Sequence, residues 1–95
     1  MPLEDLRETI RGIDEQILWL LAERMEVVTD ILEEKKRIGM PINDDRQNEL
    51  VLKRAMERAT ELGLDPAPVR TIFETIIKMS IEWQHELSDD ESKAS

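Results

Sequence analysis

Residues 6–31 read LRETIRGIDEQILWLLAERMEVVTDI, and the spacing of their apolar side chains decides the fold. Steps of three and four residues mark one helical face, which we call the Leu6–Ile31 stripe: Leu6, Ile10, Ile13, Ile17, Leu20, Arg24, Val27 and Ile31. This spacing predicts an amphipathic α-helix. No proline interrupts the pattern between residues 3 and 38, and Gly39 followed by Pro41 is typical of a helix end. A single helix is therefore expected over residues 3–38.

Two shorter helices are predicted after this long one. Asp44 or Asp45 can act as the N-cap of the second helix, which is expected to end at Gly63. Asp65–Pro66 is a typical start for the third helix, and apolar residues recur in it as far as Leu87. The sequence thus predicts a single all-α domain over residues 1–95, in which the polar residues 88–95 form a disordered tail.

The length of the first helix predicts an assembly. At 1.5 Å per residue a helix of 36 residues is roughly 54 Å long, whereas a compact chain of this size is only about 30 Å across. Two shorter helices cannot cover an apolar face of that length. We therefore expect an intertwined antiparallel homodimer with three helices per chain, in which the long helices pair about a two-fold axis.

Composition excludes several classes of function. The formal charge is −9, which argues against nucleic acid as a partner, because binding to phosphates requires a basic surface. The chain has no cysteine and one histidine, so neither a thiolate site nor a His-rich metal centre is expected, and no cofactor is implied. No apolar run reaches the ~18 residues of a membrane span, and the N-terminus lacks the apolar core of a signal peptide. We expect a cytoplasmic protein without a membrane partner.

Polar residues interrupt the apolar faces at a few positions. They are Arg24 and Lys35 on the first helix, Gln47 and Asn48 at the start of the second, and Ser80 and Gln84 on the third. A buried ion without a partner is costly, so these residues should share counter-charges or a ligand. Each has an ordinary structural explanation, such as an ion pair between Arg24 and a nearby acid. As a set on an acidic protein, however, cations and amides on converging faces favour an anionic ligand.

A third cation reaches Arg24 and Lys35 only across a dimer. Arg24 and Lys35 are eleven residues apart, so they face the same way at roughly 16 Å along the helix axis. Arg7 lies about 42 Å from Lys35 on the same helix. In an antiparallel dimer centred near Leu21, Arg7 of one chain falls opposite Lys35 of the other. Such a dimer predicts two pockets, each with Arg24, Lys35 and Arg7 of the partner subunit.

Taken together, these residues resemble a known family, the small all-helical chorismate mutases. The motifs that carry the resemblance are LRExIxxID at 6–14, LLAER at 20–24, Lys35, PIND at 41–44 and FxxIIxxSxxxQ at 73–84. It covers residues 3–87 without a gap. The resemblance implies an intertwined homodimer and an isomerase of aromatic amino acid biosynthesis in the shikimate pathway, which converts chorismate to prephenate.

The resemblance also implies roles for particular residues. Arg7 would enter the site from the other subunit and bind one substrate carboxylate, and Arg24 would bind another. Lys35 and Gln84 would donate to the ether oxygen of the breaking bond. Ser80 would contact the ring-side carboxylate region, and Asp44 would lie in the loop that lines the site. The reaction is an intramolecular rearrangement that needs no nucleophile, metal or cofactor.

The chain departs from the family at two positions. Without a gap, the usual Arg-Glu pair at the start of the second helix falls on Gln47 and Asn48. The family's glutamate holds the ring hydroxyl of the substrate, and the carbonyl oxygen of Asn48 can also accept. Shortening the loop by one residue would instead put Arg46 and Gln47 there, but would rotate the apolar face of the helix by one residue. We therefore expect Gln47 and Asn48 to bind substrate, with weaker or altered activity as a consequence.

Two other functions are compatible with the sequence. Isochorismate-pyruvate lyase is a related use of the same fold with a similar set of cations. The longer loop over residues 39–45 and Asp44 itself favour the mutase. A non-catalytic helical dimerisation module, in which Gln47 and Asn48 mark a decayed site, is the alternative from a different class.

Overall fold

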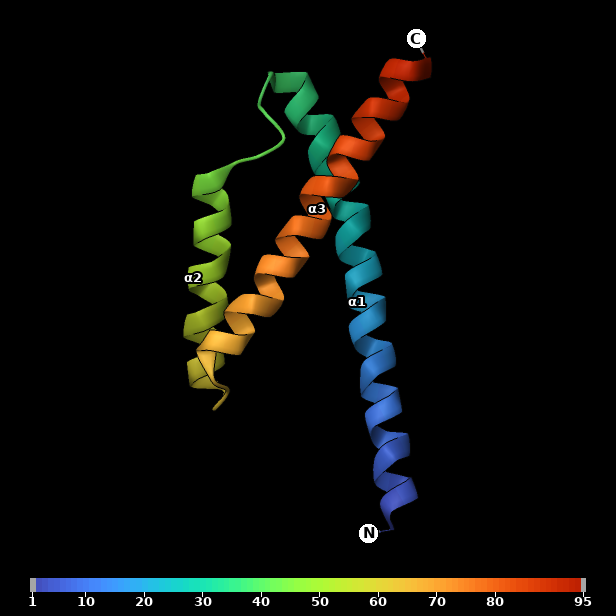
Figure 1. Ribbon diagram of the computed structural model, residues 1–95, viewed down its shortest axis with the longest axis vertical. Helices are drawn as coiled ribbons and strands as arrows, with labels where there is room; N and C mark the ends of the chain where they lie inside the picture. The colour runs from blue at the N-terminus through green and yellow to red at the C-terminus, as the bar shows by residue number, and fades with distance from the viewer. Residues whose placement is uncertain (1, 95) are drawn as a thin grey trace.

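The computed structural model describes the backbone of residues 2–94 and the side chains of residues 2–89. It consists of three helices, α1 (Leu3–Ile38), α2 (Asp45–Glu61) and α3 (Pro66–Ala94), and the described residues contain no strand (Figure 1). The predicted all-α class and the bounds of the first helix are confirmed. Helix α3 extends through Ala94, and Ser95 lies outside the described residues; the expected disorder of residues 88–95 stays a prediction.

Local chemistry explains where α1 ends and where α2 begins. Gly39 ends α1 in the left-handed conformation, with φ of 74°, and its N–H reaches back to the last turn. Positive φ is nearly free of strain only for glycine, which explains the stop. Asp44 is the N-cap of α2, and its side chain accepts a hydrogen bond from the backbone N–H of Gln47 at 3.1 Å. This cap fixes which residues occupy the first turn of α2.

Helix α3 is the element that holds the chain together. It packs along α2 and crosses the C-terminal half of α1, whereas α1 and α2 make no helix-to-helix contact within the described part. Figure 1 shows α3 running diagonally between the other two helices, with the N-terminal half of α1 standing apart from both. The small core lies at these two packings and consists of Val28, Leu32, Leu52, Ala59 and Ile77.

Most of the Leu6–Ile31 stripe is not covered within one chain. Ile10 is 57% exposed and Ile17 51% exposed. The radius of gyration is 16.9 Å, compared with about 12 Å for a compact chain of this length. The accessible surface is 7527 Å², whereas a compact monomer of 11.1 kDa has about 5,700 Å². The predicted overhang of the first helix is therefore present, and it exposes a continuous apolar surface.

None of the described helices is both long enough and apolar enough to cross a lipid bilayer.

Candidate active site

One cavity collects nearly all of the predicted site residues. It has a volume of about 160 Å³ and lies between the C-terminal half of α1, the loop and first turns of α2, and the second half of α3. Seven of the eight predicted residues line it: Arg24, Lys35, Asp44, Gln47, Asn48, Ser80 and Gln84. Its remaining walls are aliphatic, with Val28, Ile31, Ile42, Val51, Ile77 and Ile81. The cavity therefore combines a concentrated polar set with apolar walls that exclude water.

Arg24 points from α1 toward α3. Its Nη1 donates to Ser80 Oγ at 2.6 Å, and this hydroxyl in turn donates to the carbonyl of Ile76 at 3.0 Å. Burial lowers the pKa of the Arg24 guanidinium below its ordinary value, but the group stays charged at any accessible pH. No carboxylate of the described residues forms an ion pair with Arg24. A half-buried cation without a counter-charge is suited to an anionic ligand.

Lys35 is held between the loop and α3. Its Nζ donates to the carbonyl of Ile42 at 2.5 Å and to Gln84 Oε1 at 3.2 Å. An ammonium group has three N–H donors, so one remains for a ligand. Like Arg24, Lys35 forms no ion pair with a carboxylate of the described residues.

Gln84 is the most buried polar residue of the site, with only 4% of its surface exposed. Its Nε2 donates to the carbonyl of Ser80 at 3.2 Å, one helical turn back, and its Oε1 accepts from Lys35. The amide orientation is therefore determined, because Lys35 can only donate. The second N–H of Nε2 has no partner among the described residues, and Gln84 lines the cavity.

The loop before α2 and the first turns of α2 form one wall of the cavity. The Asp44 carboxylate caps the helix, and Asn48 Nδ2 donates to Asn43 Oδ1 at 3.0 Å. Gln47 and Asn48 both line the cavity. Arg46, which the slipped alignment would assign to the site, instead lines a separate groove formed by residues of α2 and by Arg70 of α3. The ungapped alignment thus agrees with the residues that reach the cavity.

The groove beside Arg46 is larger, at about 730 Å³, but its chemistry differs. Arg70, which also lines it, lies 3.9 Å from Glu49 and 3.7 Å from Glu74. Its cations thus stand among acids, and half-exposed pairs of this kind are ordinary surface features. We therefore assign the functional site to the smaller cavity.

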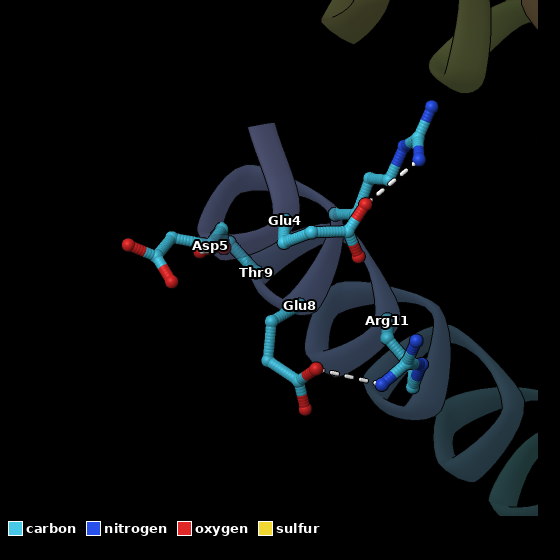
Figure 2. A network of polar contacts seen from close by, with 6 residues as sticks. Glu4, Asp5, Glu8, Thr9 and Arg11 are labelled. Atoms are coloured by element: carbon cyan, nitrogen blue, oxygen red, sulfur yellow. Dashed lines mark hydrogen bonds and ion pairs between the residues drawn. The ribbon is translucent and has the colours of Figure 1, made fainter. Parts of the chain in front are cut away.

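Arg7 is the predicted site residue that does not reach the cavity of its own chain. It lies on the first turns of α1, where Nη1 pairs with Glu4 at 2.8 Å and the side chain is 62% exposed. Figure 2 shows these turns, including the neighbouring pair of Glu8 and Arg11. Such i,i+3 pairs in water are weak, so Arg7 can exchange Glu4 for another partner at little cost. Its predicted entry into the site of a second subunit stays a prediction.

Sequence reasoning missed Asn43 and the carbonyl of Ile42, which contact Asn48 and Lys35. Both lie in the loop between α1 and α2, and no periodicity signals where a loop atom points. Among the described residues, no group of three or more His, Cys, Asp and Glu side chains is placed to bind a metal ion.

Comparison with known proteins gives a family. Residues 6–85 match the sequence model of chorismate mutase type II, a match that spans α1, α2 and most of α3 and contains the seven residues that line the cavity. The chain belongs to the chorismate mutase type II family.

Three relatives illustrate the range of this family. The chain is 33% identical to "Chorismate mutase" of Methanocaldococcus jannaschii over 76 residues, which cover 80% of this chain and 77% of the relative. It is 36% identical to "Bifunctional chorismate mutase/prephenate dehydratase" of Escherichia coli strain K12 over 91 residues, covering 90% of this chain and 22% of the relative. It is 31% identical to "T-protein" of Enterobacter agglomerans, covering 82% of this chain and 21% of the relative. The chain thus spans about a fifth of the length of the latter two proteins.

Proposed function

We propose that this chain is an isomerase that converts chorismate to prephenate in the cavity between α1, α2 and α3. The observation that carries this proposal is the convergence of two half-buried cations, Arg24 and Lys35, on one small cavity without a carboxylate partner. Membership of the chorismate mutase type II family supports it. The substrate carries two carboxylates, and the donors of the cavity are suited to a compact dianion.

The first task of the site is to hold the substrate in its reactive conformer. The guanidinium of Arg24 binds one carboxylate in a bidentate manner, while Ser80 Oγ, at 2.6 Å, keeps the fork oriented. A fixed, compact conformer brings the two reacting carbons together and removes the entropy cost of folding the side chain of the substrate over its ring.

The second task is to stabilise negative charge on the ether oxygen as the C–O bond lengthens. The unused N–H of Lys35 and the unused N–H of Gln84 are the two donors for this oxygen. Both groups are held before the substrate arrives, Lys35 by the carbonyl of Ile42 and Gln84 by the carbonyl of Ser80. A preorganised donor in an apolar site is worth roughly 2.7–4 kcal/mol of transition-state stabilisation.

The proposed enzyme is a homodimer. The exposed Leu6–Ile31 stripe and an accessible surface about 1,800 Å² above that of a compact monomer support an obligate interface along α1. Antiparallel pairing about a two-fold axis near Leu21 would bring Arg7 of the partner subunit to the open side of the cavity, beside Lys35. That arginine supplies the second carboxylate contact, which the single chain lacks.

The dimer predicts a strong effect of one charge on the stripe. Ile13→Lys is expected to shift the protein from dimer toward monomer at micromolar concentration, because it puts a charge at a doubly repeated apolar contact worth about 1.5–3 kcal/mol per side chain. The measurement is sedimentation velocity. Glu15→Lys is the matched control, since residue 15 is about 200° away around the helix and should leave the dimer intact. Equal behaviour of the two variants would argue against an interface on this stripe.

The proposed activity is tested by product analysis. Purified protein is incubated separately with chorismate and with isochorismate, and prephenate, pyruvate and salicylate are measured. We expect loss of chorismate with formation of an equal amount of prephenate. Release of pyruvate with salicylate from isochorismate would assign the protein to the lyase instead. If neither substrate is consumed, the chain is not an enzyme of this type.

A further inference from the structure

Three side chains form a continuous hydrogen-bonded chain across the loop that closes the cavity. Asn43 Nδ2 donates to Asp45 Oδ1 at 3.1 Å, and Asn48 Nδ2 donates to Asn43 Oδ1 at 3.0 Å. These hydrogen bonds link the exposed loop residue Asn43 and the exposed first residue of α2, Asp45, to the half-buried Asn48 in the first turn of α2. Neither Asn43 nor Asp45 lines the cavity, whereas Asn48 does.

The carboxylate of Asp45 determines the direction of both hydrogen bonds. An ionised carboxylate only accepts hydrogen bonds, so Asn43 must turn its amide nitrogen toward Asp45. The oxygen of Asn43 then faces Asn48 and accepts from its nitrogen. Amide nitrogen and oxygen are often assigned from the surrounding network, and here the carboxylate leaves one consistent assignment for both asparagines.

These hydrogen bonds determine how the amide of Asn48 is oriented where this residue lines the cavity. With Nδ2 engaged by Asn43, the carbonyl oxygen Oδ1 is the acceptor that the amide of Asn48 retains for a ligand in the cavity, which this residue lines. This oxygen has no hydrogen-bond partner among the described residues. Three other side chains that line the cavity, Arg24, Lys35 and Gln84, offer donors. Asn48 therefore contributes an acceptor without adding a negative charge beside a dianion.

We propose that Asp45 and Asn43 are positioning residues that set the amide of Asn48 as a neutral acceptor for a hydroxyl group of the bound ligand. This inference rests on the proposed function, because the ring hydroxyl of chorismate is the donor that the acceptor would meet. Asp44 also lines the cavity, and its Oδ1 accepts from the backbone N–H of Gln47, but its ionised carboxylate is a charged acceptor, whereas the amide of Asn48 is neutral. Asp45, which lies outside the cavity, thus decides whether Asn48 offers its oxygen or its nitrogen to a ligand.

The test is to reverse the direction of the hydrogen bonds that join the side chains at positions 45, 43 and 48. Asn48→Asp puts acceptor-only groups at both ends, and Asn43 cannot turn its nitrogen to both. We expect KM for chorismate to rise about tenfold with little change in kcat, because a contact made equally in ground and transition state acts on KM. Adding Asp45→Asn should restore KM to within about threefold of the wild type, because the donors now run from position 45 to position 48. In the otherwise wild-type protein Asp45→Asn should raise KM, whereas in the Asn48→Asp variant it should lower KM.

Two controls separate this coupling from simple charge repulsion. Glu49→Gln removes a carboxylate next to position 48 that takes no part in the chain, and it should not rescue Asn48→Asp. When Asn43→Ala is also present, Asp45→Asn should no longer rescue Asn48→Asp. The charges at positions 45 and 48 are the same in that experiment, so repulsion alone would still predict a rescue. Rescue by Glu49→Gln, or equal rescue without Asn43, would overturn the proposal.

A measurement without turnover keeps this inference separate from the proposed function. The side-chain amide signals of Asn43 and Asn48 are followed by ¹⁵N–¹H NMR in the dimeric protein. Asp45→Asn should shift both signals, whereas Glu49→Gln should shift neither. If the wild type does not consume chorismate, the proposed function fails, while the NMR result still decides whether Asp45, Asn43 and Asn48 are hydrogen-bonded to one another in solution. Unshifted signals, or shifted signals without kinetic rescue, contradict the positioning role.

Discussion

Lys35→Ala is expected to lower kcat for chorismate about 10²–10³-fold while the protein remains a folded helical dimer, because it removes a preorganised donor from the breaking bond. Lys35 is tied to the loop and to α3 through Ile42 and Gln84. Without it, these two acceptors take up water at the edge of the cavity. The effect should therefore fall on kcat rather than on the helical content.

The measurement is steady-state kinetics with circular dichroism of the same preparation. Lys36→Ala is the matched control, because Lys36 is the next residue, is exposed and does not line the cavity. Lys35→Gln retains an N–H donor without the charge and should be intermediate. Near-normal kcat for Lys35→Ala would mean that the charge on the ether oxygen is stabilised by other groups.

Arg24→Ala is expected to have an effect of similar size, seen mainly in kcat/KM. Truncating one partner of a buried charged contact typically costs about 2–4 kcal/mol, or roughly 30- to 1000-fold. Arg24→Lys should recover only part of this loss, because an ammonium group cannot form the bidentate contact with a carboxylate. Ser80→Ala removes only the hydroxyl that orients the guanidinium at 2.6 Å and should cost less.

The stability of the Arg24→Ala variant is informative as well. Burial already lowers the pKa of this guanidinium, which means that the charge is partly desolvated without a counter-charge. Its removal should therefore not lower the free energy of unfolding by more than ~1 kcal/mol. Arg11→Ala is the control for activity, since Arg11 pairs with Glu8 in solvent at 2.7 Å. A large loss of stability together with unchanged KM would identify Arg24 as a structural residue.

Most of the fold could be predicted because its signals are local. The periodicity of residues 3–38 and the stop at Gly39 determine α1, and Asp44 and Asp65 act at the starts of α2 and α3 as expected. The polar composition of residues 88–95 predicts a disordered tail, and this stays a prediction. Residues 88–94 contain neither glycine nor proline, which is compatible with the extension of α3 through Ala94.

The candidate site could be predicted only in part. Arg24, Lys35, Ser80 and Gln84 were visible as polar residues on apolar helical faces, and the structure brings them to one cavity. Asn43 and the carbonyl of Ile42 depend on the path of a loop, which side-chain periodicity does not encode. Arg7 is a different case, because its role depends on a second copy of the chain.

We propose that each active site is completed by a residue of the second subunit, and mixing two variants of low activity distinguishes this arrangement from a site within one chain. Arg7→Ala and Arg24→Ala chains are unfolded together in equal amounts, refolded, and assayed with chorismate beside each variant treated alone. Half of the dimers should then contain one chain of each kind, and each such dimer has one intact site, so roughly a quarter of the wild-type activity should return. Activity no higher than the mean of the two separate variants, or full activity of Arg7→Ala alone, would contradict a shared site.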